Sequence, residues 1–226
     1  MSYYGDQKPF DGAEFIDNPE PRCPCILLVD KSGSMAGHAI AQLNDGLITF
    51  KEELMADSMA AKRVEVSVIS FGPVNVESDF LTPDIFQAPS LKASGNTPMG
   101  AAIERAVEIL NHRKSIYRQN GIAYYRPWIF LMTDGAPTDN WQRAAQLVHD
   151  GEADRAFVFF AVGTEDADFD TLKRISSRDP LKLRELRFRD LFSWLSNSLS
   201  SVSRSTVGDE IPLSNPIAPN GWASIS

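Results

Sequence analysis

The sequence predicts an α/β protein with a mostly parallel central sheet, one antiparallel edge strand and helices on both faces. Three observations lead to this fold class. Short apolar runs at residues 25–29, 128–133 and 156–162 are typical of strands that are buried on both faces. Amphipathic stretches with apolar residues three or four positions apart separate these runs. Because strands and helices alternate, the strands are expected to pair in parallel through crossover helices.

The first strand, residues 25–29, ends at Asp30 and leads into a polar loop. A helix is expected next, because apolar side chains recur at alternating spacings of three and four residues, at Ile40, Leu43, Leu47, Phe50 and Leu54. Residues 63–71 alternate between apolar and polar side chains and predict a second strand. Gly72-Pro73 ends this strand, so residues 74–81 are expected to pair with it in the antiparallel direction.

The second half of the chain continues the alternation. Thr97-Pro98 predicts a helix start, since a hydroxyl residue before proline at the first helical position is a common start signal. A strand at residues 128–133 ends at Asp134, and Asp139 is expected to cap a short helix that runs to Val148. The remaining elements are a strand, a short helix, a last strand and a closing helix, expected at residues 156–162, 169–175, 183–188 and 191–202.

The 226 residues suffice for one domain with flanking segments. Residues 1–21 lack a sustained period and are expected to form an N-terminal arm, residues 22–203 hold the domain, and residues 204–226 form a C-terminal tail rich in Ser, Pro, Asn and Gly. Cys23 and Cys25 are expected to be buried, unpaired thiols, as in a reducing compartment.

The charge balance excludes several classes of partner. Asp and Glu total 30 against 22 Lys and Arg, which gives a formal charge of −8. Nucleic acids and anionic membranes attract clustered cations, so neither is an expected partner. The apolar runs are too short to span a bilayer. The chain start also lacks the pattern of a secretion signal, so we expect a cytoplasmic location.

Oxygen-bearing side chains follow two of the predicted strands. Asp30, Ser32 and Ser34 alternate in the loop after the first strand, so their side chains are expected to turn toward one point. Thr97 at a helix start can add a hydroxyl, and Asp134 can add a carboxylate. The carboxyl ends of parallel strands meet at one edge of a sheet, where ligands bind. Such oxygen-only ligands suit Mg²⁺, with Mn²⁺ or Ca²⁺ as alternatives, and do not suit zinc.

Three motifs of this chain are Asp30-x-Ser32-x-Ser34, Thr97 and Thr133-Asp134-Gly135. Together they resemble the metal-ion-dependent adhesion site of von Willebrand factor A (VWA) domains. Residues 27–35, 96–101 and 130–139 are further similar to the bacterial TerY-like branch, which is tied to tellurium resistance and stress. The resemblance runs from about Pro21 to Val202. It implies the Rossmann-like VWA fold and a protein-interaction module that depends on a divalent metal.

The resemblance also implies roles for the five residues. Ser32 and Ser34 would ligate the ion directly, and Thr97 directly or through water. Asp30 and Asp134 would hold coordinated waters or bind the ion themselves. Because the three hydroxyls are neutral, the ion would keep an open position, and two nearby helix starts favour an incoming anion. We therefore expect a partner protein to supply an acidic side chain to the metal.

Two other functions remain open at this point. AAA+ ATPases of the MoxR or chelatase kind use similar A domains, so an adaptor role is an alternative. The sequence disfavours a metal-dependent hydrolase, because Ser32 lacks a Gly-x-Ser-x-Gly elbow and also replaces the second aspartate of a haloacid-dehalogenase phosphatase. We therefore predict that the protein is not an enzyme. The sequence does not indicate the oligomeric state.

Overall fold

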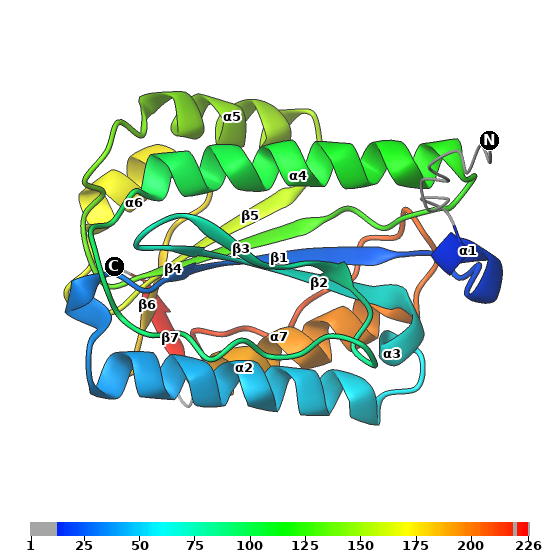
Figure 1. The fold of residues 1–226 in the computed structure, drawn as a ribbon, viewed down its shortest axis with the longest axis horizontal. Helices are drawn as coiled ribbons and strands as arrows, with labels where there is room; N and C mark the ends of the chain where they lie inside the picture. Colours follow the sequence, from blue (N-terminus) through cyan, green and yellow to red (C-terminus); the bar gives the residue numbers. More distant parts are fainter. Residues whose placement is uncertain (1–12, 219–220, 226) are drawn as a thin grey trace, which may run out of the picture.

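The computed structural model describes residues 13–218 and 221–225, which form a central sheet with helices on each face (Figure 1). The strands of the described ranges are β1 (Cys23–Asp30), β2 (Val64–Phe71), β3 (Asn75–Leu81), β4 (Trp128–Thr133), β5 (Val158–Gly163), β6 (Leu181–Leu183) and β7 (Ala223–Ile225). The helices are α1 (Ala13–Asp17), the 3-10 turn η1 (Gly33–Met35), α2 (His38–Ala56), α3 (Ala60–Arg63), α4 (Met99–Gln119), α5 (Gln142–Ala153), α6 (Phe169–Ile175) and α7 (Phe188–Ser203).

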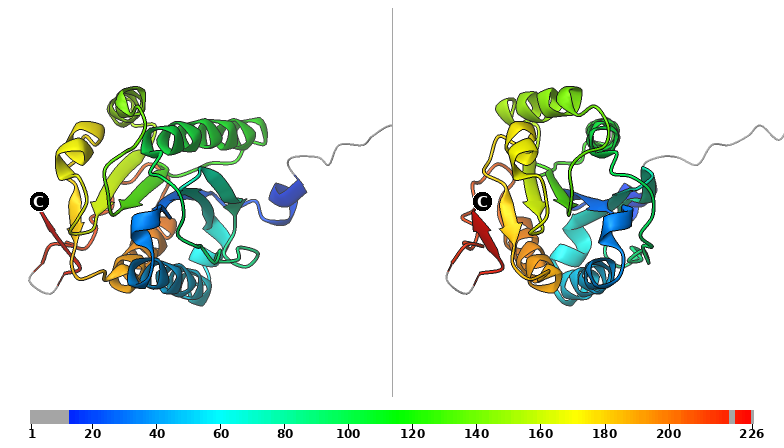
Figure 2. Two further views of the ribbon diagram at one scale, coloured as in Figure 1. Left: turned by 60° about the vertical axis from the view of Figure 1, so that its left-hand side comes forward. Right: turned by 90° about the vertical axis from the view of Figure 1, so that its left-hand side faces the viewer.

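The sheet order is β3-β2-β1-β4-β5-β6-β7 within the described residues. The pairs from β2 to β6 are parallel. β3 is antiparallel to β2 at one edge, as the sequence predicts across Gly72-Pro73. Helices α2 and α7 cover one face, and α4, α5 and α6 cover the other (Figures 1 and 2). The predicted α/β fold is therefore confirmed.

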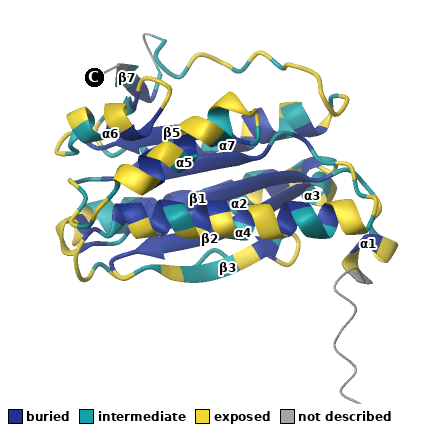
Figure 3. Ribbon diagram, turned by 90° about the horizontal axis from the view of Figure 1, so that it is seen from above, coloured by how far each residue is buried: buried dark blue, intermediate teal, exposed yellow. Residues whose placement is uncertain are grey.

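Strand β1 lies at the centre of the sheet and is buried along its whole length (Figure 3). Its alternate side chains enter different layers, with Leu27 packing toward α2 and α7 and Leu28 toward α4. Both cysteines, Cys23 and Cys25, are buried and free, as the sequence predicts. Burial raises the pKa of Cys23 to about 12, and the charge of Glu65 adds to this effect, so the thiol stays protonated.

Helix α2 packs closely against α7 through the apolar stripe that its sequence predicts. Leu43, Leu47, Phe50 and Leu54 are buried, whereas Ile40 is partly exposed and packs at the margin. Gly46 lies within this interface. A Cβ atom at position 46 would lie 2.5 Å from Cδ2 of Phe192, so only glycine permits this approach of the two helices.

Two features of the C-terminal part differ from the sequence-based expectations. The last parallel strand occupies Leu181–Leu183, so the strand predicted at residues 183–188 is wrong. Glu185 and Leu186 have φ angles of 49° and 56°, a left-handed conformation that ends the strand. The predicted tail adds β7, which pairs antiparallel with β6 as a second edge strand. Trp222 is buried there against Trp194, with ring centroids 5.6 Å apart.

The N-terminal arm that the sequence predicts is described only from residue 13 onward, and residues 1–12 lie outside the described residues. The boundaries of the three predicted segments therefore stay predictions. No helix among the described residues combines the length and the apolar character that a membrane crossing requires.

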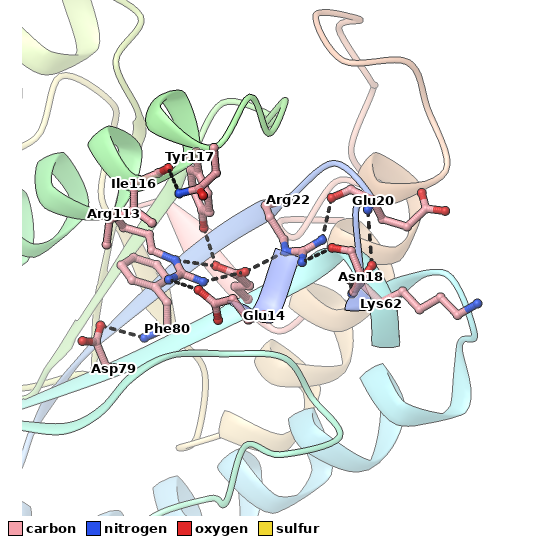
Figure 4. Close-up of polar contacts among 12 residues, drawn as sticks. Glu14, Asn18, Glu20, Arg22, Lys62, Asp79, Phe80, Arg113, Ile116 and Tyr117 are labelled. Atoms are coloured by element: carbon pink, nitrogen blue, oxygen red, sulfur yellow. Dashed lines mark hydrogen bonds and ion pairs between the residues drawn. The ribbon is translucent and has the colours of Figure 1, made fainter. Parts of the chain in front are cut away.

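A buried ionic cluster closes the amino-terminal end of the sheet (Figure 4). Glu65 on β2 is 1% exposed and accepts hydrogen bonds from Arg22 Nε at 2.8 Å and from Arg113 Nε and Nη2 at 2.9 and 2.8 Å. The hydroxyl of Tyr117 also donates to Glu65. Two arginines and a phenol thus satisfy a carboxylate that would otherwise be costly to bury.

Helix α1 packs onto the same cluster. Glu14 accepts a hydrogen bond from Arg113 Nη1 at 2.7 Å. The ring of Phe15 lies 5.2 Å from the guanidinium carbon of Arg22 and 5.3 Å from that of Arg113. Such cation–π contacts add to the packing of this ring. The segment that precedes β1 therefore covers the ionic cluster.

We expect the substitution Arg113→Met to lower the free energy of unfolding by about 3 kcal/mol, because it removes one partner of a buried carboxylate. Chemical denaturation of the full chain measures this loss. Arg105→Met is the matched control on the same helix, since among the described residues Arg105 pairs only with exposed Glu108. The control should lose less than about 0.5 kcal/mol, and equal losses in the two variants would contradict the prediction.

Candidate metal centre

Four of the five predicted ligand residues are linked by hydrogen bonds at the carboxyl edge of the sheet, which faces the reader in the right-hand view of Figure 2. The hydroxyl oxygens of Ser32 and Ser34 lie 3.0 Å apart. Ser34 Oγ donates to Asp134 Oδ1 at 2.8 Å across 100 positions of sequence. The backbone N–H of Ser32 donates to Asp30 Oδ1 at 2.7 Å. The loops after β1 and β4 therefore meet through these side chains.

Thr133 holds the Asp30 carboxylate in place. Its Oγ1 donates to Asp30 Oδ2 at 2.6 Å, and Asp30 is fully buried. Burial raises the pKa of Asp30, whereas the hydrogen bonds from Thr133 and Ser32 lower it. The sequence motif alone does not indicate this role for Thr133. Its position at the end of a strand next to β1 is the signal that it orients Asp30.

Asp134 adds a second carboxylate beside the first, and its exposure is intermediate. Burial raises the pKa of Asp134, the hydrogen bond from Ser34 lowers it, and the charge of Asp30 raises it further. Lys31 is the basic residue nearest in sequence, but its Nζ lies 3.0 Å from Glu77 Oε1 on β3. The described residues thus bring two carboxylates together, and a cation at this edge would relieve their repulsion.

Thr97 lies on the neighbouring loop, and its side chain is 6% exposed. The backbone N–H of Gly33 donates to the carbonyl of Gly95 at 3.0 Å, which holds this loop against the loop after β1. The N–H of Thr97 donates to Thr138 Oγ1 at 3.0 Å. Within the described part of the chain, no hydrogen bond joins the Thr97 hydroxyl to the other four residues. The structure therefore brings the loop of Thr97 to the edge but does not connect its hydroxyl to the set.

The contact between the loops requires glycine at position 95. Gly95 has a φ angle of 74°, in the left-handed region that favours glycine. A Cβ atom there would lie 2.7 Å from the carbonyl oxygen of Gly72. The loops that follow β2 and precede α4 can approach each other only because this side chain is absent.

Asp139 caps a different helix from the one that the sequence predicts. Its carboxylate accepts hydrogen bonds from the N–H groups of Gly100 at 3.0 Å and Ala101 at 2.8 Å, in the first turn of α4. Helix α5 begins later, at Gln142. The physical reason is that Pro98, at the cap position of α4, makes no side-chain hydrogen bond, so the free N–H groups donate to a carboxylate from another loop. Asp139 thereby positions the segment that carries Thr97.

The available ligands suit a hard cation. They are carboxylate and hydroxyl oxygens, which Mg²⁺, Mn²⁺ and Ca²⁺ prefer. Among the described residues, no group of three or more His, Cys, Asp or Glu side chains is arranged to hold a metal ion. A metal at this edge would therefore depend on the serine hydroxyls and on water. Ser34 is exposed, so the set is open to solvent.

Residues 25–191 match the family model of the von Willebrand factor type A domain. Because the match covers most of the chain, the protein belongs to this family. The fold and the order of its motifs agree with the resemblance that the sequence carries. A comparison with curated proteins finds no match.

Solved structures show the same fold. Proximal thread matrix protein 1 from the mussel byssus matches 80% of this chain and 48% of its own, at 16% identity and a TM-score of 0.54. The pilus adhesin SpaC from Lactobacillus rhamnosus GG, in its open conformation, matches 80% of this chain and 30% of its own, at 14% identity and a TM-score of 0.65. The chain thus spans about half the length of the mussel protein and less than a third of the adhesin.

The substitution Asp139→Ala should lower the free energy of unfolding by about 1–2 kcal/mol, because it leaves two N–H groups of α4 without their cap. Thermal or chemical denaturation measures the change. Asp45→Ala is the control, since Asp45 is exposed on α2, and it should change stability by less than about 0.5 kcal/mol. A variant at position 139 that is as stable as the control would contradict the capping role.

Proposed function

We propose that this chain is a protein-interaction module that depends on a divalent metal, and that its metal site is built from Asp30, Ser32, Ser34, Thr97 and Asp134. The observation that supports this most is the hydrogen-bonded set of two carboxylates and two hydroxyls from the loops after β1 and β4. Membership of the VWA family supports the same reading. We propose Mg²⁺ as the ion, with Mn²⁺ and Ca²⁺ as alternatives.

Each residue would have a distinct task in this site. Ser32 and Ser34 would turn their hydroxyl oxygens from each other to the ion, and Thr97 would approach from the loop held by Asp139. Asp30 keeps its orientation because Thr133 and the Ser32 backbone N–H hold both carboxylate oxygens. When bound, the ion would supply a positive charge with an open coordination position.

The charges of the site favour an acidic partner. The proposed ligands include at most two negative charges, and the serine and threonine hydroxyls add none. Helix α2 starts nearby without a side-chain cap and without an acidic residue in its first turn, so its positive dipole end is available to an anion. Helix α4 contributes less, because Asp139 already occupies its first N–H groups. We therefore propose that a partner protein binds through an Asp or Glu side chain.

The cellular setting is a separate proposal. Segments 27–35, 96–101 and 130–139 support a TerY-like protein of a cytoplasmic tellurium-resistance or stress system. An adaptor subunit for a MoxR or chelatase-type ATPase is the alternative. Affinity purification of the tagged chain separates the two, because an AAA+ ATPase or proteins of tellurium resistance would be recovered. We propose no catalytic role, and a panel of hydrolase substrates with Mg²⁺ tests this.

Removal of one hydroxyl should weaken metal binding. We expect Ser32→Ala to lower the affinity for Mn²⁺ and Mg²⁺ by at least about tenfold, in line with the losses seen when groups around a metal are removed. Calorimetric titration and Mn²⁺ electron paramagnetic resonance measure this directly. Ser115→Ala, in the last part of α4, serves as the control, because it removes a hydroxyl that donates to the Asn111 carbonyl within its own helix. Saturable binding that is equal in both variants would overturn the assigned site.

Partner binding should depend on the same ion. A protein captured by the tagged chain in Mg²⁺ should be released by EDTA and should not bind the Ser32→Ala variant. Once that protein is identified, changing its contacting Asp or Glu to the amide should remove the Mg²⁺-dependent part of the affinity. A complex that keeps its full affinity in EDTA would argue against a metal-bridged interaction.

A further inference from the structure

A cavity of about 810 Å³ lies between the starts of β4 and β5 and the tail that follows α7. Trp128 is the first residue of β4 and lines this cavity, whereas Thr133, the last residue, reaches the candidate metal centre. The two sites are thus at opposite ends of one strand. Pockets of roughly 300–1,000 Å³ are typical for small-molecule ligands, so the size of the cavity is sufficient for one.

One wall of the cavity is apolar. Trp128 and Phe160 stand side by side on the sheet, with ring centroids 5.8 Å apart, and Val158 lies beside them. Ile211 and Leu213 face them from the tail. The tail segment, residues 204–218, runs along the outer edge of the molecule beside α7 (Figure 3). Aromatic and aliphatic side chains thus cover both sides of a space that could hold an apolar group.

Two hydrogen bonds from aromatic side chains attach the tail to the domain. The Tyr125 hydroxyl donates to the carbonyl of Ser205 at 2.6 Å, and Trp194 Nε1 donates to the carbonyl of Ser214 at 2.8 Å. These two contacts hold the ends of the segment that closes the cavity. The family match ends at residue 191, so this wall belongs to a part of the chain outside the matched domain.

Three arginines, Arg126, Arg155 and Arg178, line the same cavity, and the guanidinium carbon of Arg178 lies 5.8 Å from the centre of the Phe160 ring. Arg126 and Arg178 direct Nε and Nη2 to backbone carbonyls or to Glu152. Arg155 directs Nη2 to Glu210. Among the described residues, Nη1 of each of the three arginines has no hydrogen-bond acceptor. The cavity therefore presents guanidinium N–H groups beside an aromatic wall.

Three acidic side chains accompany these arginines, namely Glu152, Asp209 and Glu210, and Asp209 accepts a hydrogen bond from the Thr206 N–H at 3.2 Å. Arg126 and Arg178 share one carboxylate, Glu152, whose side chain is 8% exposed. Burial lowers the pKa of Arg126, and the charges of Arg178 and Arg155 lower it further, although Glu152 acts in the opposite direction. Glu210 belongs to the tail and its side chain is 84% exposed, so the partner of Arg155 can move away. An added anion would find the Nη1 donors of the three arginines free of acceptors among the described residues, and it could replace Glu210 as the partner of Arg155.

We propose that this cavity binds a small amphipathic organic anion, with its apolar part against Trp128 and Phe160 and its carboxylate or similar group on the arginines. An uncharged apolar ligand would leave the Nη1 donors of the three arginines without an acceptor from the ligand. A small inorganic anion would leave the aromatic wall without a partner. Guanidinium groups bind carboxylates with charge-assisted hydrogen bonds, which gives the site its selectivity for the anion. The site is independent of the proposed metal function.

The test compares two probes that share an apolar chain, decanoate and decanol, by calorimetry on the full chain in EDTA. We expect decanoate to bind at one site and at least about tenfold more tightly than decanol. Arg178→Gln should lower the affinity for decanoate by about tenfold and leave the affinity for decanol unchanged. Arg143→Gln carries the same charge change at an exposed position on α5 and should bind decanoate like the unchanged protein.

A second pair of variants keeps the test valid if Arg178→Gln does not fold. Glu210→Gln releases Arg155 from its partner on the exposed tail, so decanoate should bind severalfold more tightly. Glu108→Gln, an equal charge change at an exposed site on α4, should leave the affinity unchanged. The proposal is overturned by a lack of saturable decanoate binding, by equal affinities for the two probes, or by equal effects in each variant and its control.

Discussion

The candidate metal centre depends on the parallel pairing of β1 with β4. Val29 pairs with Met132, so the last residues of the two strands, Asp30 and Thr133, lie side by side and form a hydrogen bond of 2.6 Å. This bond orients a fully buried carboxylate. A slip of one residue in the register would turn Asp30 to the other face of the sheet. The loops that carry Ser34 and Asp134 would then no longer meet.

The buried carboxylates at the two ends of the sheet have different hydrogen-bond partners. At the amino-terminal end, Glu65 is neutralised by Arg22 and Arg113, and α1 covers the cluster. At the carboxyl end, Asp30 and Asp134 receive hydrogen bonds only from hydroxyl and backbone groups among the described residues. The first arrangement satisfies its charge inside the protein and stabilises the fold. The second leaves negative charge near solvent, which is the chemical condition that a cation site requires.

The tail gives this chain features that lie outside the matched domain. It adds β7 to the edge of the sheet, buries Trp222 against Trp194, and closes the arginine-lined cavity. The tail segment at residues 204–218 has no regular secondary structure. The cavity lies between this segment and the starts of β4 and β5. The proposed anion site and the proposed metal site are therefore built from different parts of the chain.

The sequence by itself determined the buried strands, the main amphipathic helices, and the Asp30-x-Ser32-x-Ser34 loop, because each depends on a local period or spacing. The strand predicted at residues 183–188 was wrong, because the actual strand β6 has three residues and is too short to show a period. Only the tertiary structure decided that Asp139 caps α4, that Thr133 holds Asp30, and that the tail joins the sheet. These contacts join residues far apart in the chain, so their partners are chosen by packing and hydrogen-bond demand and not by local pattern.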